Sequence, residues 1–186
     1  MPLGLLISAL LVWQTSTAAF SATTANGGNS WAAGTVALTD DDSGSAMFTA
    51  NNLSPGATGV RCIQVTYNGT VTAGVKLYVG QLTPGSPNLA PYVQMTVEEG
   101  SGGTFSGGCA GFTAIGSPIV AANTPLSTLA TTHSNYGNGA GAWTTTAGSP
   151  GQTRAYRFTY RLDPNTPNSA QGGSVTASFT WEAQTP

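Results

Sequence analysis

Charged residues are scarce in this chain of 186 residues. Asp, Glu, Lys and Arg together make up 6% of it, against about 25% in an ordinary soluble domain. The cationic side chains are Arg61, Lys76, Arg154, Arg157 and Arg161. So small a set excludes the basic surface that nucleic acids require and the polybasic segment that anchors proteins to anionic membranes. We therefore expect neither nucleic acid nor, after export, a membrane among the partners of this protein.

Side chains that carry out chemistry are also few. The chain has one histidine, His133, and two cysteines, Cys62 and Cys109. Two thiols and a distant histidine do not supply the four ligands of a zinc site. The sequence contains neither the G-x-S-x-G signature of many serine hydrolases nor the H-E-x-x-H signature of zinc peptidases. These residues predict no catalytic centre, no metal site and no cofactor, which favours a binding or structural role over catalysis.

The chain begins with an apolar run. Residues 3–13 read LGLLISALLVW, and the small residues TSTAA follow at 15–19. This length suits the core of a signal peptide and is too short for a membrane span, which needs roughly 20 apolar residues. We expect a signal peptide over residues 1–19, cleaved near Ala18-Ala19, although Met1-Pro2 lacks the Lys or Arg with which signal peptides open. The alternative is a buried hydrophobic strand that stays in the mature protein.

The two cysteines fit a protein that is exported into an oxidising compartment. Only one intramolecular pairing is possible, between Cys62 and Cys109. It closes a loop of about 48 residues, which the chain-entropy treatment values at roughly 4 kcal/mol. Two free, buried thiols are the alternative.

Alternation of apolar and polar residues predicts several β-strands. The clearest runs are 71–80, 93–98, 156–162 and 175–183, and weaker ones lie at 35–39, 46–50 and 60–67. The dipeptide Asn68-Gly69 lies between two of these patterns and predicts a tight hairpin. About seven or eight short strands, each with one apolar face, predict an all-β sandwich of the jelly-roll type.

One short helix is expected among the strands. Thr124 is a suitable cap, Pro125 suits the first helical position, and Leu126 with Leu129 begins an apolar stripe. The helix should end by about residue 135. Two Gly-rich stretches are expected to be surface loops: residues 100–111 and 137–148.

The carboxylates offer one candidate ion site. Asp40, Asp41 and Asp42 form the one dense acidic cluster, and Ca²⁺ binds about 6–8 oxygen ligands. Adjacent side chains rarely converge on one ion, so a solvated turn between strands is the expected interpretation. Glu98 and Glu99 end a strand pattern with their side chains on opposite faces, and we interpret them as solubilising charges at a sheet edge.

Aromatic and cationic side chains offer two candidate binding surfaces, each with a structural alternative. Tyr78, Tyr92 and Trp143 suit stacking on sugars or packing within the sandwich. Arg157 and Arg161 share one strand face and suit an acidic partner or glycan, whereas a paired outer face is the commoner outcome.

Three segments resemble the TasA/camelysin family of secreted proteins. The first is AFSATTANGGNSWAAGTVALTDDDSG over residues 19–44, whose core N-S-W-A-A-G-T-V-x-L resembles the start of mature family members. The second is FTANNLSPGATGVRCIQVTYNGT over 48–70, which is similar to the family's next strand, N-L-x-P-G turn and further strand. The third is LDPNTPNSAQGGSVTASFTWEAQ over 162–184, which is similar to the family's N-x-x-Q-G turn and final aromatic-rich strand. Residues 80–151 carry no motif of the family.

The resemblance implies a secreted jelly-roll sandwich that assembles into extracellular fibres of a biofilm matrix. In such proteins the segment after the cleavage site adds a strand to a neighbouring subunit, so the contacts are head-to-tail and extend an open filament. Carried over here, residues 1–19 are the signal peptide, 20–31 the donor segment and 32–186 the β-sandwich. The donor residues are Phe20, Ser21, Ala22, Thr23, Thr24, Ala25, Asn26, Gly27, Gly28, Asn29, Ser30 and Trp31.

Two alternatives to a fibre subunit stay open. A monomeric cell-surface or glycan-binding module suits the near-neutral composition equally well, and a secreted metallopeptidase follows from how camelysin-like relatives are classed. The single histidine and the lack of grouped ligands weigh against the peptidase. For the fibre subunit, the expected partners are further copies of the chain and an accessory matrix or anchoring protein, outside the cell or at its surface.

Overall fold

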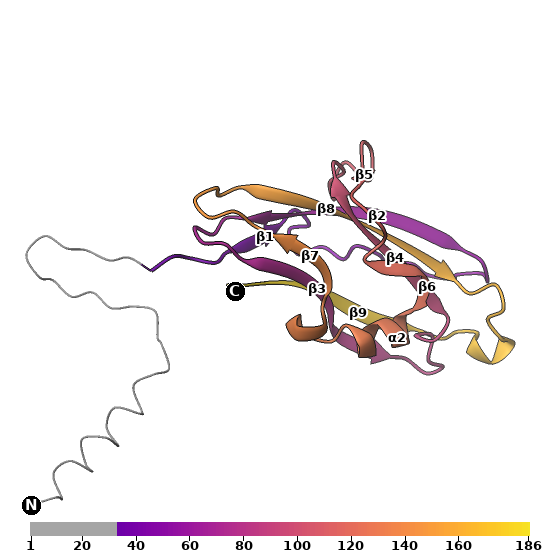
Figure 1. Ribbon diagram of the computed structural model, residues 1–186. Coiled ribbons are helices and arrows are strands. Elements are labelled where there is room, and N and C mark those ends of the chain that lie inside the picture. Colours follow the sequence, from indigo (N-terminus) through magenta and orange to yellow (C-terminus); the bar gives the residue numbers. More distant parts are fainter. Residues whose placement is uncertain (1–32) are drawn as a thin grey trace, which may run out of the picture. The chain divides into compact units, whose positions relative to one another are not determined.

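A computed structural model describes residues 33–186, and they form two antiparallel β-sheets packed face to face (Figure 1). The larger sheet has the order β1-β2-β8-β4-β5, with β6 also paired to β4, and consists of β1 (Leu38–Asp40), β2 (Thr58–Tyr67), β8 (Gln152–Leu162), β4 (Val93–Ser101), β5 (Thr113–Ala114) and β6 (Val120–Pro125). The smaller sheet has the order β7 (Ala140–Thr144), β3 (Gly74–Pro84) and β9 (Val175–Gln184). The predicted all-β sandwich is thus confirmed. The predicted signal peptide (1–19) and donor segment (20–31) lie outside the described residues.

The core lies between the two sheets and follows from the alternation in the sequence. In β3, the buried residues Val75, Leu77 and Val79 alternate with half-buried ones. In β8, Phe158 is fully buried, and its ring lies 4.9 Å from that of Phe179 in β9, measured between centroids. Because side chains in a strand point alternately to opposite faces, a period of two places one apolar row from each strand in this layer.

Most strand predictions are confirmed, and one is wrong. The predicted strands at 60–67, 93–98, 156–162 and 175–183 correspond to β2, β4, β8 and β9. Residues 46–50, also predicted as a strand, form none. Met47 and Phe48 instead pack against the core, and the Phe48 ring meets Tyr160 edge-on at 5.0 Å. The two side chains that pack against the core are thus partly buried without strand pairing, and they are adjacent in the chain.

The hairpin predicted at Asn68-Gly69 is also wrong. β2 and β3 belong to different sheets, so residues 68–73 cross from one layer to the other. Neither Asn68 nor Gly69 has a positive φ, which a two-residue type I′ hairpin requires. The backbone N–H of Thr70 donates to the carbonyl oxygen of Thr35 (2.8 Å), so the turn pairs with the segment before β1.

The predicted helix is confirmed as α2 (Leu126–Thr132), the one α-helix among residues 33–186. Leu126 and Leu129 are buried, as the apolar stripe predicts. The predicted cap is wrong, because Pro125 occupies the N-cap position and the hydroxyl of Thr124 donates to the carbonyl of Ala121 (2.8 Å). Within the part of the chain that is described, no helix is long and apolar enough to cross a membrane. Two 3-10 turns, η2 (Tyr136–Asn138) and η3 (Asn168–Ala170), complete the helical elements of this region.

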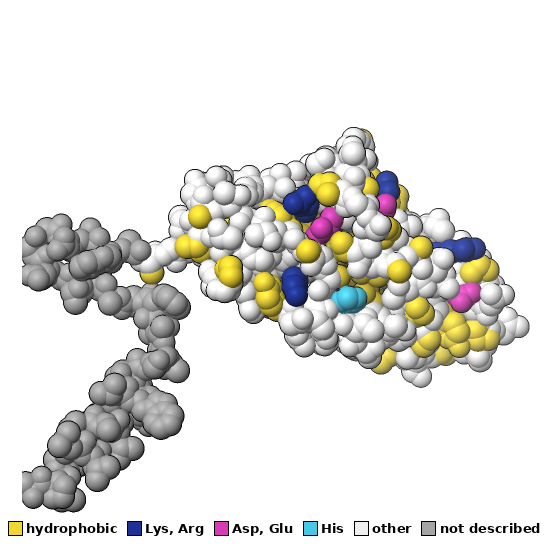
Figure 2. Space-filling view, viewed as in Figure 1, with side chains coloured by type: hydrophobic (Ala, Val, Ile, Leu, Met, Phe, Trp, Pro, Cys, Tyr) yellow, Lys and Arg dark blue, Asp and Glu magenta, His cyan; other side chains and the backbone are white. Residues whose placement is uncertain are grey.

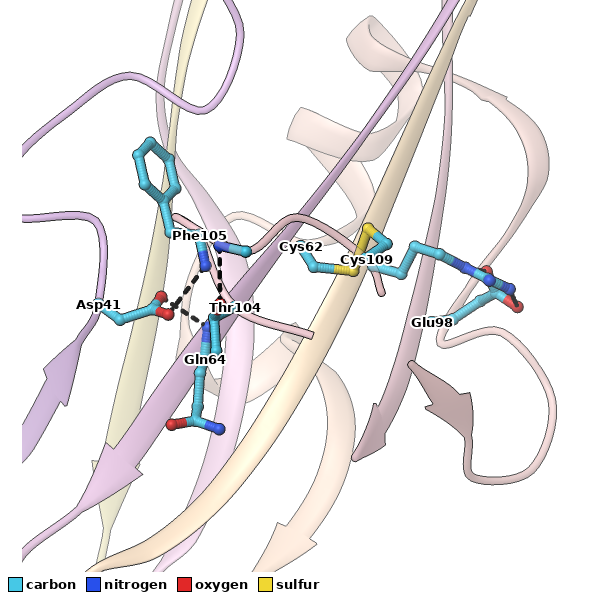
Figure 3. The surroundings of a disulfide bond; sticks show 9 residues. Asp41, Cys62, Gln64, Glu98, Thr104, Phe105 and Cys109 are labelled. Atoms are coloured by element: carbon cyan, nitrogen blue, oxygen red, sulfur yellow. Dashed lines mark hydrogen bonds and ion pairs between the residues drawn. A yellow bond between two sulfur atoms is a disulfide. The ribbon is translucent and has the colours of Figure 1, made fainter. Parts of the chain in front are cut away.

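The predicted disulfide between Cys62 and Cys109 is present, with a Cα–Cα distance of 5.1 Å. It fastens residues 102–112 to the outer face of β2 (Figure 3). The loop approaches so closely that a Cβ on Gly103 would lie 3.2 Å from the Cys62 sulfur, and Gly103 also has a positive φ of 78°. Cys62 itself is completely buried. The bridge therefore holds a loop that covers part of the larger sheet.

Asp41 braces the same loop from a second side. Its carboxylate accepts hydrogen bonds from the backbone N–H groups of Gln64 (2.8 Å) and Phe105 (2.8 Å), one at each oxygen (Figure 3). Asp42 accepts a hydrogen bond from the N–H of Gly44 (2.6 Å) within its own turn. Charge-assisted bonds of this kind are about twice as strong as neutral ones. The acidic cluster thus has a structural role, joining the turn after β1 to β2 and to the disulfide loop.

Candidate functional site

The two sheets differ in width, and the difference leaves a cleft on one side of the sandwich. β9 ends the smaller sheet and β1 ends the larger one, and the two edges contact each other. Between them lies a cleft of about 210 Å³, roughly the volume of seven waters at ~30 Å³ each. Its lining is mixed and consists of four apolar residues, Leu38, Val65, Phe179 and Trp181, and three polar ones, Thr39, Asp40 and Thr180. One further strand beside β9 would cover this cleft.

β9 is the longest free strand edge in residues 33–186. It has ten residues and pairs only with β3 in this region. Native sheets guard such edges with lysine, proline, bulges or very short strands. β9 contains no lysine and no proline. Its one charged residue, Glu182, is already hydrogen-bonded within the sheet. Its carboxylate accepts hydrogen bonds from the hydroxyl of Tyr78 (2.9 Å) and the side-chain amide of Gln184 (2.6 Å). β9 therefore offers an unprotected row of backbone donors and acceptors.

The cleft carries a weak acidic feature at one side. Burial raises the pKa of the Asp40 carboxyl above its usual range, and the neighbouring Asp42 raises it further through a hydrogen bond and charge repulsion. No lysine or arginine lines the cleft. A segment that binds here should not be acidic, because the Asp40 carboxylate would repel it and no cation in the lining would offset that repulsion.

Unpaired polar atoms lie in the core, and one of them belongs to Trp181, which also lines the cleft. Among the described residues, four buried side-chain atoms have no hydrogen-bond partner: Glu99 Oε1, Arg154 Nε, the Tyr156 hydroxyl and Trp181 Nε1. Glu99 and Tyr156 are direct cross-strand neighbours, and the Tyr156 ring lies 5.3 Å from that of Trp181. An unsatisfied buried polar group costs about 1–3 kcal/mol. The hydrogen-bonding capacity of buried polar side chains is thus left unused in this part of the core.

Glu99 is placed differently from its prediction. The opposite orientation of Glu98 and Glu99 holds, but Glu99 faces the smaller sheet, where a Cβ on Gly141 would lie 2.6 Å from its Oε1. Burial raises the pKa of the Glu99 carboxyl, and Arg154 lowers it in part. Burial, with the Glu99 charge nearby, likewise raises the pKa of the Tyr156 hydroxyl. Glu99 is therefore an internal carboxyl rather than a solubilising edge charge.

Replacing this carboxyl should change how stability depends on pH. A carboxyl with a raised pKa stabilises the fold below its unfolded value of about 4.3, and this contribution is lost as pH rises through the folded pKa. We expect the free energy of unfolding of Glu99→Gln to decrease less with rising pH than that of the wild type. The variant should therefore be at least as stable as the wild type at pH 7. Urea unfolding at pH 4, 5.5 and 7 measures this. An unchanged slope in Glu99→Gln contradicts the prediction.

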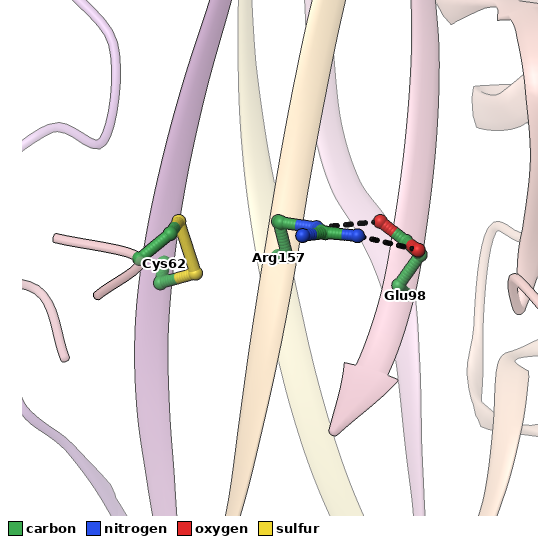
Figure 4. Close-up of polar contacts among 4 residues, drawn as sticks. Cys62, Glu98 and Arg157 are labelled. Atoms are coloured by element: carbon green, nitrogen blue, oxygen red, sulfur yellow. Dashed lines mark hydrogen bonds and ion pairs between the residues drawn. A yellow bond between two sulfur atoms is a disulfide. The ribbon is translucent and has the colours of Figure 1, made fainter. Parts of the chain in front are cut away.

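Arg157, on the outer face of the larger sheet, is paired with a carboxylate of the same chain, as expected. Its guanidinium donates two hydrogen bonds to Glu98, at 2.7 and 2.8 Å (Figure 4). It also lies 4.6 Å from the centre of the Phe112 ring in the disulfide loop. Cys62, Arg157 and Glu98 occupy one row across β2, β8 and β4. Arg157 is thus occupied within the chain and is not free to bind an acidic partner.

The three aromatic residues considered for sugar stacking do not form an exposed platform. Trp143 is 4% exposed and lies in the core, where the guanidinium of Arg154 sits 5.5 Å from its ring centre. Tyr78 is half-buried and bonded to Glu182, and Tyr92 lies in the loop between β3 and β4. In the described residues, no three His, Cys, Asp or Glu side chains gather as a group that could hold a metal ion.

The cleft beside β9 is a feature that sequence reasoning missed. The apolar row Phe179 and Trp181 was recognised, but which neighbours β9 lacks is a property of the folded sheet. The one available signal was the low charge of a long final strand. No model of a known protein family matches this sequence, and no curated protein matches it either.

Proposed function

We propose that this protein is a secreted structural subunit that polymerises head-to-tail by strand donation into extracellular fibres, as in a biofilm matrix. In this proposal residues 20–31 of one copy add a strand to β9 of the next. The observation that carries it is the free edge of β9, which has no lysine or proline and lies beside a cleft lined by Leu38, Val65, Phe179 and Trp181 together with three polar residues. The resemblance to the TasA/camelysin family supports the same assignment.

The physical basis is the addition of a strand to an open sheet edge. The main chain of the donor gains hydrogen bonds from β9, and every second donor side chain enters the cleft over Leu38 and Val65. Residues 1–32 contain no Asp, Glu, Lys or Arg, so the donor itself brings no charge that would have to be desolvated. A donor of this length is also comparable to β9, which has ten residues.

Export is supported by two independent features. The disulfide between Cys62 and Cys109 suits an oxidising compartment, and the apolar run at residues 3–13 suits a signal peptide. The proposed partners are further copies of the chain, together with an accessory matrix or anchoring protein at the cell surface. The proposal assigns no catalytic activity to this fold.

Removing the donor should abolish assembly. We compare a mature chain that begins at Phe20 with one that begins at Ser30, by size-exclusion chromatography and negative-stain microscopy. The longer chain should form fibres, and the shorter one should stay monomeric with the same circular dichroism spectrum, because it keeps the cleft and loses the strand that fills it.

The shorter chain also provides a matched control for the mechanism. It can accept a strand but cannot give one, so a small fraction added to the longer chain should end growing fibres and shorten them. Fibres formed by the chain that begins at Ser30 would falsify the proposal.

A further inference from the structure

The two ends of the sandwich differ, and one of them is rich in proline. The turn at 54–57 and the loops 85–92 and 163–174 form this end, which we call the proline end. These loops are joined by hydrogen bonds such as Gly85 N–H to Ser174 O and Gly56 N–H to Leu162 O, both 2.8 Å. Its prolines are all exposed: Pro55, Pro87, Pro91, Pro164 and Pro167. In Figure 2, drawn in the same view as Figure 1, apolar side chains gather at the end where β8 continues into β9.

The far end carries the start of the chain that leads into the sandwich. This end consists of Thr35, the turn at 68–73 and the loop at 145–151, and we call it the far end. Thr70 N–H donates to Thr35 O at 2.8 Å, and Gly148 N–H donates to Thr70 O at 3.1 Å. Since residues 20–31 precede Thr35 in the chain, any strand that they donate is tethered to the far end of its own subunit.

Both ends are almost free of charge. Of all their residues only Asp163 is charged, and its carboxylate accepts hydrogen bonds from the Gln94 side chain (3.1 Å) and the Asn165 N–H (2.8 Å). Prolines have no N–H to satisfy and a fixed φ, so ordering them in a contact costs little entropy. Apart from the Asp163 carboxylate, which is hydrogen-bonded within its own subunit, two such surfaces can be pressed together without burying a charge.

Strand direction decides which ends meet. All pairs of named strands in the described residues are antiparallel. β9 starts at the proline end, where Val175 pairs with Pro84, and finishes near the far end, where Gln184 pairs with Gly74. A donor that follows the same antiparallel rule runs the other way, so its last residue, Trp31, emerges at the proline end of the subunit that accepts it.

The short connection then forces contact. From Trp31 to Thr35 the chain has four steps and reaches at most about 14 Å, at ~3.3–3.6 Å per residue. We infer that the proline end is the docking face for the far end of the next copy of this chain, a conclusion that rests on the proposed strand donation. The contact joins two different surfaces, so it extends an open filament. A parallel donor would instead bring two far ends together, and reciprocal exchange would close a dimer.

Charge placed on the proline end should block assembly while leaving the cleft and donor intact. We compare the mature chain that begins at Phe20 with its Asn165→Lys/Ser169→Lys variant, both positions being exposed in the loop 163–174. The control variant, Ala114→Lys/Ala122→Lys, adds the same charge at exposed positions of β5 and β6. We expect wild type and control to form fibres and the proline-end variant to lose them, with all three melting alike. Equal fibres from all three overturn the docking face but leave strand donation standing, whereas a wild type that stays monomeric or forms only closed dimers overturns it together with the head-to-tail assembly.

Crosslinking tests the same contact without relying on the loss of assembly. Ser149 lies in the far end and Asn165 in the proline end, and both are exposed. Oxidised fibres of the Ser149→Cys/Asn165→Cys variant should give a ladder of covalent oligomers on a denaturing gel, and fibres of Asn165→Cys alone should give monomers. Crosslinked dimers from Asn165→Cys alone show that like ends meet and overturn the inference.

Discussion

Moving residues 20–31 from the front of the chain to its C-terminal end should give a stable monomer in place of the proposed fibres. The variant begins at Ser30 and carries the donor sequence after Pro186 through a short Gly-Ser linker. β9 finishes at Gln184, so a tight turn returns the donor antiparallel along the free edge of the same copy. The tethered segment acts at an effective concentration in the millimolar range and should occupy the cleft before a neighbour can.

Chromatography, microscopy and thermal melting measure this result. The fused chain should elute as a monomer, form no fibres and melt several degrees above the chain that merely begins at Ser30. A matched control carries Thr23→Pro and Ala25→Pro in the fused segment, which removes backbone donors from the added strand. The control should melt like the unfused chain. Equal melting temperatures for the fused chain and its proline control contradict the assignment of the cleft.

The second large effect is expected on removing the disulfide. Cys62→Ala/Cys109→Ala should lower the free energy of unfolding by about 4 kcal/mol, because the unfolded chain regains the freedom of a loop of about 48 residues. For a domain of this size, that corresponds to a fall of roughly 10 °C in melting temperature. The fold itself should persist, since Asp41 still holds Phe105 and Arg157 still lies against Phe112.

Hydrogen exchange locates the loss. Amide protection should fall most in residues 102–112, which the bridge holds against β2. Wild-type protein treated with a thiol reductant is the matched control and should show the same fall in melting temperature. A double variant that melts with the wild type shows that the bridge adds nothing to stability.

The sandwich could be predicted because its cause is local. Val75, Leu77 and Val79 alternate with polar neighbours in β3, and burial of that row requires only that some second layer be present. β7, by contrast, was predicted as a loop, because its buried residues Ala140 and Trp143 are separated by a glycine and an exposed alanine and show no such period. Short strands without a full apolar row carry too little signal.

Pairing between strands could not be predicted, because it depends on segments far apart in the sequence. Asn68-Gly69 has the composition of a hairpin, yet both edges of β2 are taken by β1 and β8. The core-facing side chains of β2 pack against the opposite sheet, to which β3 belongs, so β3 is a neighbour of β2 across the core and not along its edge. The same non-local pairing leaves β9 without a second neighbour, and so the cleft was invisible in the sequence.

The disulfide could be predicted from the sequence, whereas the cleft beside β9, the proposed acceptor of the donor strand, could not. Two cysteines allow one pairing, which the structure contains. The donor segment came from resemblance and stays a prediction. Glu99 was misjudged because alternation shows that neighbours face opposite ways, but not that both faces of β4 near its end are covered.

Binding of the isolated donor to the isolated acceptor tests the account most directly. A synthetic peptide with the sequence of residues 20–31 is added to the chain that begins at Ser30, and amide exchange is followed residue by residue. The peptide should bind saturably at one copy per chain and slow exchange along β9 and at Leu38, beside the cleft. Failure to bind, or protection that falls on β6 or β7 and leaves β9 unchanged, would show that the free edge of β9 does not bind a strand from a neighbouring copy.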